Sequence, residues 1–118
     1  MSFEFKNDIP IYLQIIEYIK QQIINKTYLP QQKIPSVRDL SVFFEVNPNT
    51  IQKALTELEE IGLIITERTN GKFITDNIQI IEKIKKETIK QKVNSFYESM
   101  KNFGVSKEEV LEILNKKD

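Results

Sequence analysis

The chain has 118 residues, 40% of them hydrophobic, and its 17 basic and 17 acidic side chains leave no net charge, which suits one compact domain with a helical extension. It contains no cysteine and no histidine, so disulfides and thiolate metal sites are excluded and the commonest general base is missing. No apolar run approaches the roughly 20 residues that span a bilayer, and the first ten residues lack a secretory pattern, so we expect a cytoplasmic protein with no membrane partner.

The first predicted helix covers residues 10–26. Asp8 is placed to cap it, and Pro10 lies near its first turn. Residues 27–35 hold two prolines and no helical period, which indicates a loop, although residues 33–34 are placed to add a short strand to a later sheet. The apolar face of the helix is predicted from six isoleucines at helical spacing: Ile11, Ile15, Ile16, Ile19, Ile23 and Ile24.

Two short helices joined by a tight polar turn follow this loop. Ser36 is a favourable N-cap for the earlier of the two, with Asp39 three residues later as a variant of the capping box. Asn47 is the corresponding cap for the later helix, where Pro48 occupies the first position and its missing N–H does no harm. We expect that helix to end at Gly62. The buried face of the earlier helix is predicted to consist of Val37, Leu40, Phe43 and Phe44.

Two β-rich stretches, residues 63–66 and 72–75, come next and flank Asn70-Gly71, a dipeptide that favours positive φ and tight hairpins. The order helix, turn, helix, hairpin is the one by which many proteins place one helix in the DNA major groove. We therefore predict a mainly α fold with a small β-hairpin wing, in which residues 1–76 form a winged helix-turn-helix DNA-binding domain.

The third predicted helix is expected to present a polar face to a DNA duplex. At 100° per residue, its core face consists of Ile51, Ala54, Leu55, Leu58 and Ile61. The opposite face consists of Asn49, Gln52, Lys53 and Thr56. Asn and Gln can bond adenine at two positions, Lys can bond guanine, and Thr50 on the flank suits a phosphate. The alternative is a polar face that is merely solvated, which is the usual case for an isolated amphipathic helix.

Further DNA contacts are predicted around this helix. Ser36 and Arg38 lie at a helix N-terminus, where backbone N–H groups favour a phosphate, although Ser36 can be a simple cap and Arg38 can pair with a surface acid. Asn47 lies in the turn that leads into the recognition helix. A wing tip can place basic side chains in the minor groove, the alternative being an ordinary polar turn. The candidates at the tip are Arg68, Asn70, Gly71 and Lys72.

A long helix over residues 77–102 and a last helix capped by Ser106 are predicted after the hairpin, with Gly104 between them. Spacings of three and four, interrupted by one lysine, mark a seam on the long helix: Ile78, Ile81, Lys85, Ile89, Val93, Phe96, Met100 and Phe103. Such a seam suits helix–helix packing, so we predict residues 77–118 to be a dimerisation segment that packs partly on its last helix and partly on a second subunit. The alternative is packing wholly within one chain. The predicted dimer contacts are Ile81, Ile89, Val93, Phe96 and Met100.

These motifs resemble those of the GntR family of bacterial transcription regulators. The resemblance is carried by PSVRDL at 35–40, VNPNTIQKAL at 46–55, the helix end and wing at 57–74, and IPIYLQIIEYIKQQI at 9–23. It implies a winged helix-turn-helix that binds operators as a homodimer. By position, it implies DNA contacts at Ser36, Arg38, Asn49, Thr50, Lys53, Arg68 and Gly71. The short two-helix tail is similar to the YtrA-like subfamily, whose members often repress transporter operons.

The leading interpretation is a homodimeric, sequence-specific DNA-binding repressor acting on a palindromic operator. No cofactor, metal or enzymatic activity is expected, because no nucleophile–base pair, phosphate loop or metal cluster is visible. The charge distribution opposes this interpretation, since residues 1–76 hold 8 basic against 10 acidic side chains and residues 77–118 hold 9 against 7. The alternative is a winged-helix protein–protein interaction module in a larger assembly. A small-molecule effector stays open, although so short a tail is not expected to enclose a usual ligand pocket of about 300 Å³ or more.

Overall fold

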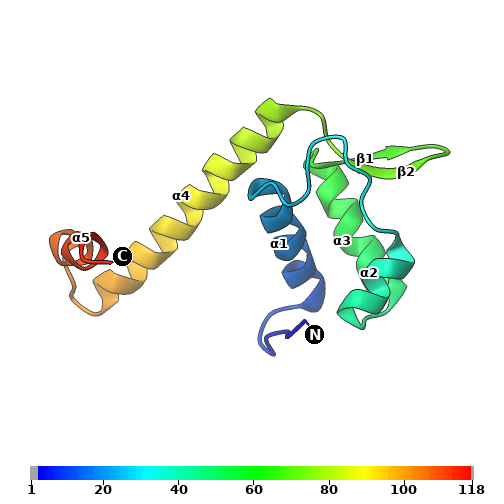
Figure 1. Cartoon of the computed structure of the whole chain (residues 1–118). Coiled ribbons are helices and arrows are strands. Elements are labelled where there is room, and N and C mark those ends of the chain that lie inside the picture. The colour runs from blue at the N-terminus through cyan, green and yellow to red at the C-terminus, as the bar shows by residue number, and fades with distance from the viewer. Residues whose placement is uncertain (1–2, 118) are drawn as a thin grey trace. The chain divides into compact units, whose positions relative to one another are not determined.

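The computed structural model describes residues 3–117 and has the predicted mainly α architecture with one small hairpin (Figure 1). In chain order, the elements are α1 (Ile11–Ile24), α2 (Val37–Phe44), α3 (Pro48–Glu60), β1 (Ile64–Glu67), β2 (Gly71–Ile74), α4 (Ile78–Asn102) and α5 (Lys107–Asn115). The chain divides into two compact units, one ending at Glu82 and the other beginning at Lys83, so the first turn of α4 belongs to the first unit. No helix among the described residues is both long enough and apolar enough to cross a bilayer.

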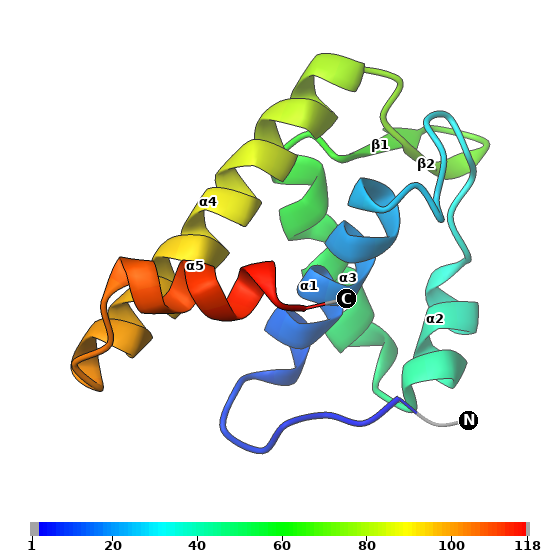
Figure 2. The same ribbon diagram turned by 60° about the vertical axis from the view of Figure 1, so that its left-hand side comes forward.

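The core of the first unit lies where α3 packs against α1 and α2, with the hairpin following directly from α3 (Figures 1 and 2). Each helix contributes side chains at helical spacing, and burial of such a stripe is the main source of the unit's stability. The buried side chains of the three helices are Ile15, Ile19, Ile23, Leu40, Phe44, Ile51, Ala54, Leu55 and Leu58. The loop, the hairpin and the first turn of α4 complete this core with Ile34, Leu63, Ile64, Ile74 and Ile81.

Three side chains that were predicted to be buried are exposed. Ile11 is the first residue of α1, and Ile61 follows the last turn of α3, so neither is covered by a neighbouring helix. Phe43 is exposed because the short α2 buries only the narrow stripe formed by Leu40 and Phe44. The Phe43 ring instead packs edge-on against Phe44, with 4.9 Å between ring centroids.

The helix caps follow the local rules for α2 and α3. Ser36 Oγ accepts a hydrogen bond from the backbone N–H of Asp39 at 3.0 Å, and Asn47 Oδ1 accepts one from Asn49 at 2.8 Å, as predicted. The predicted cap of α1 is wrong, because the N-cap position is Pro10 rather than Asp8. The Gln14 side chain holds the entry to this helix instead, donating to the Ile9 carbonyl at 2.8 Å.

The hairpin pairs β1 and β2 antiparallel, with Ile64 opposite Ile74 and Glu67 opposite Gly71. Both strands lie one residue away from their predicted bounds. Only Gly71 adopts positive φ (+100°) at the turn, so Asn70-Gly71 does not form the two-residue turn that the dipeptide favours. Lys33 forms an isolated bridge with Phe73 on the other edge of β2, so residues 33–34 lie beside the sheet, as expected, but do not form a third strand.

The long tail helix α4 begins one residue after its predicted start and ends at Asn102 as predicted, and Ser106 caps α5 as predicted. Asn77 Oδ1 accepts from the N–H of Ile80 at 3.2 Å, and Ser106 Oγ accepts from Glu109 at 3.2 Å. Gly104 makes the turn between the helices with φ of +73°. None of the described residues from Lys83 onward is buried, so this unit has no closed core of its own.

Candidate nucleic-acid interface

The α3 helix separates its side chains into a buried apolar face and an exposed polar face. Ile51, Ala54, Leu55 and Leu58 are at most 1% exposed. Asn49, Gln52, Lys53 and Thr56 are exposed, and Thr50 on the flank is half-buried. The predicted polar stripe is therefore available at the surface, and its first residues lie next to the N-terminus of the helix, the part that usually meets base edges.

The side chain of Lys53 is held by a residue that was not predicted to take part in the site. Its Nζ lies 3.9 Å from the centroid of the Tyr12 ring, which belongs to α1. An ammonium over the negative face of an aromatic ring is attracted by the ring quadrupole. The contact restricts the flexible lysine stem on the face that is proposed to meet DNA.

The N-terminal turn of α2 carries two of the predicted phosphate contacts. Ser36 is exposed and acts as the cap, while Arg38 is exposed one residue into the helix. Within residues 3–117, Arg38 forms no ion pair, so the surface acid that the alternative required is absent from this part of the chain. Asn47 likewise combines an exposed position with a capping role for α3.

The wing tip is formed by Arg68, Thr69 and Asn70, followed by Gly71. Arg68 is exposed, and Asn70 Nδ2 donates to Glu67 Oε2 at 3.2 Å, which closes the turn locally. Gly71 has φ of +100°, a backbone conformation that L side chains rarely adopt. The tip therefore offers one basic side chain, Arg68, on a tight and well-defined turn.

Lys72 does not lie at the tip in the way that the sequence suggested. Its side chain is 22% exposed, and its Nζ contacts Glu59 Oε1 and donates to Thr66 Oγ1 at 2.9 Å. Strand alternation causes this, because Lys72 shares its side of β2 with the buried Ile74. Lys72 therefore joins the wing to the C-terminal turn of α3, where Glu59 is its partner.

The pKa of Glu59 reflects this pairing. Partial burial acts to raise the pKa, but hydrogen bonds from Lys72 and Thr66, together with the charge of Lys72, outweigh it and hold the pKa below its usual range. The Glu59 carboxylate that contacts Lys72 is therefore ionised near neutral pH.

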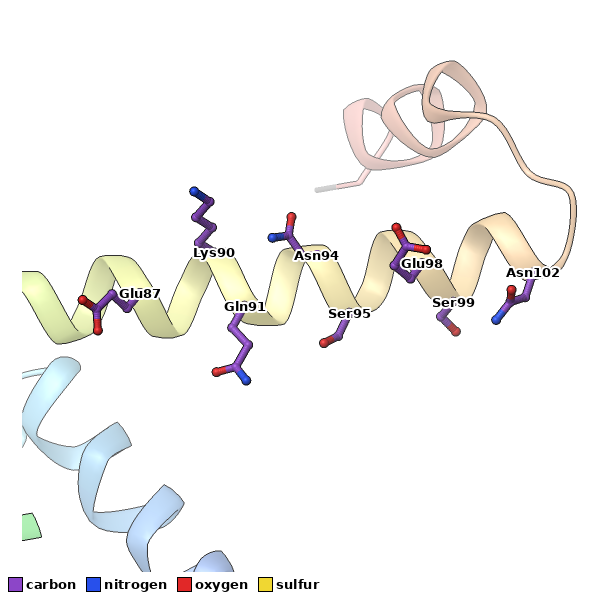
Figure 3. Close-up of a pocket in the computed structure, with 8 residues that line it drawn as sticks. All are labelled: Glu87, Lys90, Gln91, Asn94, Ser95, Glu98, Ser99 and Asn102. Atoms are coloured by element: carbon purple, nitrogen blue, oxygen red, sulfur yellow. The ribbon is translucent and has the colours of Figure 1, made fainter. Parts of the chain in front are cut away.

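The predicted dimer contacts fall into two environments. Ile81 is only 8% exposed and belongs to the core of the first unit, which corrects its assignment to an open seam. Ile89, Val93 and Phe96 are exposed, and Met100 is half-buried. These four residues lie on the unit that begins at Lys83. The same helix also carries eight polar side chains, including Gln91 and Ser95, that line a separate surface (Figure 3).

An apolar groove of about 730 Å³ lies between α4 and α5. Val93, Phe96 and Tyr97 line it from α4, and Val110, Leu111 and Leu114 line it from α5. The tail was not expected to enclose a usual ligand pocket of about 300 Å³ or more. The groove is open rather than enclosed, because the turn at Gly104 brings the two apolar faces together while their side chains stay partly exposed.

The chain matches the family described as bacterial regulatory proteins, gntR family, over residues 11–74. It is also 38% identical over 112 residues to the uncharacterized HTH-type transcriptional regulator YhcF of Bacillus subtilis, covering 95% of this chain and 93% of that protein. The chain belongs to the GntR family. Membership confirms the resemblance drawn from the helix and wing motifs, and the family and this relative are regulators rather than enzymes.

Other GntR-type proteins extend the similarity. The HTH-type transcriptional repressor YtrA of B. subtilis is 42% identical over 72 residues, which are 61% of this chain and 55% of YtrA, and this supports the YtrA-like comparison. A solved GntR family transcriptional regulator from Listeria monocytogenes superimposes with a TM-score of 0.90 at 38% identity, covering 97% of this chain and all of that one. The winged-helix fold of the GntR family is thereby confirmed, two-helix tail included.

A structure of the AraR DNA-binding domain in complex with operator ORX1 matches 64% of this chain and 99% of that one, with a TM-score of 0.58 and 32% identity. The part of this GntR chain that is similar to AraR thus corresponds to a domain solved with DNA.

Two candidate residues in the first unit were missed by sequence reasoning. Tyr12 contacts Lys53 from another helix, and Lys33 lies beside the wing. For Lys33, the one signal in the sequence was the strand predicted at residues 33–34, because pairing with the hairpin brings Lys33 next to the wing.

Proposed function

We propose that this GntR family member is a homodimeric repressor that binds a palindromic DNA operator in a sequence-specific manner. The observation that carries the proposal is the exposed polar face of α3, supported from behind by a closed apolar core. In this proposal residues 1–76 bind DNA, and the unit that begins at Lys83 joins two copies.

Base recognition is assigned to the first two turns of α3. Asn49 and Gln52 supply amide groups that suit adenine, and Lys53 supplies an ammonium that suits guanine O6 or N7. Each good contact is worth about 1–3 kcal/mol of discrimination between bases. Thr50, on the flank of the same helix, is assigned to a phosphate.

Backbone contacts are assigned to the elements on either side. Ser36, Arg38 and Asn47 lie around the N-terminal turns of α2 and α3, where free N–H groups and the helix dipole favour phosphate oxygens. The wing contributes Arg68, with Asn70 and Gly71 shaping its turn. Such contacts fix the register of the protein on the duplex.

The homodimer is assigned to the unit that begins at Lys83. Its apolar side chains are uncovered within one chain, and the groove between α4 and α5 is lined by Phe96 and Leu111. Burial of this surface against a second copy would remove large hydrophobic side chains from water. Repression is proposed because YtrA, a similar protein, is named a repressor; control of a transporter operon rests only on the resemblance to that subfamily.

The DNA proposal is tested by selecting duplexes from genomic DNA with the full chain and measuring affinity by fluorescence anisotropy at several salt concentrations. We expect tight binding to the selected duplex, weaker binding to a shuffled one, and a steep fall of affinity with salt. Asn49→Ala and Lys53→Ala should reduce the preference for the selected duplex while the fold persists. Equal affinity of the unaltered chain for both duplexes would contradict the proposal and favour the protein-interaction module.

The dimer proposal is tested by sedimentation equilibrium of the full chain. Phe96→Asp combined with Met100→Asp should yield monomers with poor operator affinity, because each introduces a charge on the apolar seam. Gln91→Asp combined with Ser95→Asp is the matched control, since both residues lie among the polar side chains of α4 (Figure 3). A dimer that survives the first change, or dissociates equally with the second, would reject the seam.

A further inference from the structure

The wing sheet carries two lysines on opposite faces. Side chains alternate along a strand, so Lys72 lies on the face of β2 that also holds the buried Ile74, whereas Gly71 and Phe73 lie on the other face. Directly paired residues of antiparallel strands share a face, and Lys33 is bridged to Phe73. Lys33 therefore belongs to the outer face of the sheet, and Lys72 belongs to the inner one.

The inner lysine is neutralised by its own chain. Lys72 contacts the Glu59 carboxylate and the Thr66 hydroxyl, and only about a fifth of its side chain is exposed (22%). Pairing of this ammonium with a phosphate would require separation from Glu59, which would leave a partly buried carboxylate without its partner.

The outer lysine is placed at the end of the wing by the shape of the turn. A Cβ built on Gly71 would lie 3.2 Å from Lys33 Cε and 3.7 Å from its Nζ, so the lysine stem runs across the space that the glycine leaves free. Lys33 is exposed, and no carboxylate pairs with it within residues 3–117. Its ammonium group is therefore available beside Gly71, on the wing that also carries Arg68.

We propose that Lys33, from the loop before α2, is the second DNA-contacting cation of the wing, and that Lys72 is a latch that fixes the wing to α3. This inference rests on the proposed DNA binding and deepens it, because it assigns a phosphate contact to a residue outside the helix-turn-helix and the hairpin. The first unit has no basic excess, and Lys72 of its wing is paired with Glu59. Lys33 gives the wing a cation from a distant part of the sequence, unpaired among the described residues.

The test compares lysine-to-methionine variants, which keep the aliphatic stem and remove the charge. Lys33→Met should weaken binding to selected and shuffled duplexes by the same factor. It should also make the negative slope of log K against log salt shallower by about 1. Lys33→Arg should restore the slope. Lys72→Met should leave the slope unchanged but shift the urea unfolding midpoint downward, since it leaves Glu59 unpaired.

Lys86→Met, an exposed lysine of the second unit, is the control for a general loss of charge. An unchanged slope for Lys33→Met, or a slope shallower by about 1 for Lys72→Met or Lys86→Met, would overturn the inference. Absence of duplex binding by the unaltered chain would instead reject the proposed function, so the two failures are distinguishable.

Discussion

Replacing Tyr12 by leucine tests whether α1 positions Lys53, the lysine of α3 that we propose contacts a base. Lys53 Nζ lies 3.9 Å from the centroid of the Tyr12 ring, and leucine keeps the apolar contact of this half-buried position but removes the ring face. Without that face, the exposed lysine stem regains rotamer freedom that must be lost again when its ammonium meets a base. Operator affinity should therefore fall although Tyr12 has no assigned contact with a base.

The size of the effect follows from the exposure of the pair. A cation–π contact at an exposed site is worth about 0.5–1 kcal/mol, which corresponds to a roughly 2- to 5-fold rise in Kd for Tyr12→Leu. Lys53→Met removes the base contact itself, about 1–3 kcal/mol, so a rise of roughly 5- to 150-fold is expected. If Tyr12 acts only through Lys53, the double variant should bind no more weakly than Lys53→Met alone.

The assay is an anisotropy titration of the four proteins of this cycle with the selected duplex. Tyr12→Phe is the control, because it retains the aromatic face and should bind like the unaltered chain. Unaltered affinity for Tyr12→Leu, or a full additional loss in the double variant, would refute the positioning role.

Three further outcomes concern stability, measured by urea unfolding of the full chain. Gly71→Ala should lower the free energy of unfolding by about 1–2 kcal/mol, because it forces a Cβ into a left-handed backbone at φ of +100°; an unchanged midpoint would contradict this. Leu58→Ala should cost about 2–5 kcal/mol, since Leu58 is fully buried, and a loss below about 1 kcal/mol would show a looser core. Because folding lowers the pKa of Glu59, its ionised carboxylate should stabilise the fold at pH values above its ordinary pKa of 4.5. This stabilisation should be lost as the pH falls through the lowered pKa. Glu59→Gln should flatten that part of the stability curve, and an identical curve would argue against the Lys72 pairing.

The features that the sequence predicted well are those decided by near neighbours. Ser36 and Asn47 were recognised as caps because a cap bonds an N–H two or three residues away. The polar and apolar faces of α3 followed from helical spacing alone, and the structure keeps Lys53 exposed and Leu58 buried as predicted.

The features that it missed are decided by packing between distant segments. Phe73 and Ile74 are both apolar but lie on opposite faces of β2, so alternation alone does not tell which face is buried. Lys72 was therefore assigned to the wing tip. The contact of Tyr12 with Lys53 depends on how α1 crosses α3, which no local rule supplies. Ile81 satisfied the seam spacing but is used by the first unit, because α4 begins before that unit ends.

The central claim is that the polar face of α3 and the wing meet DNA. Backbone amide NMR shifts of the full chain, recorded with and without a selected duplex, test it residue by residue. The largest changes should fall on residues 47–56 and 67–71, with smaller ones at Lys33 and at the N-terminus of α2. Changes confined to residues 83–117, with α3 unaffected, would contradict the account.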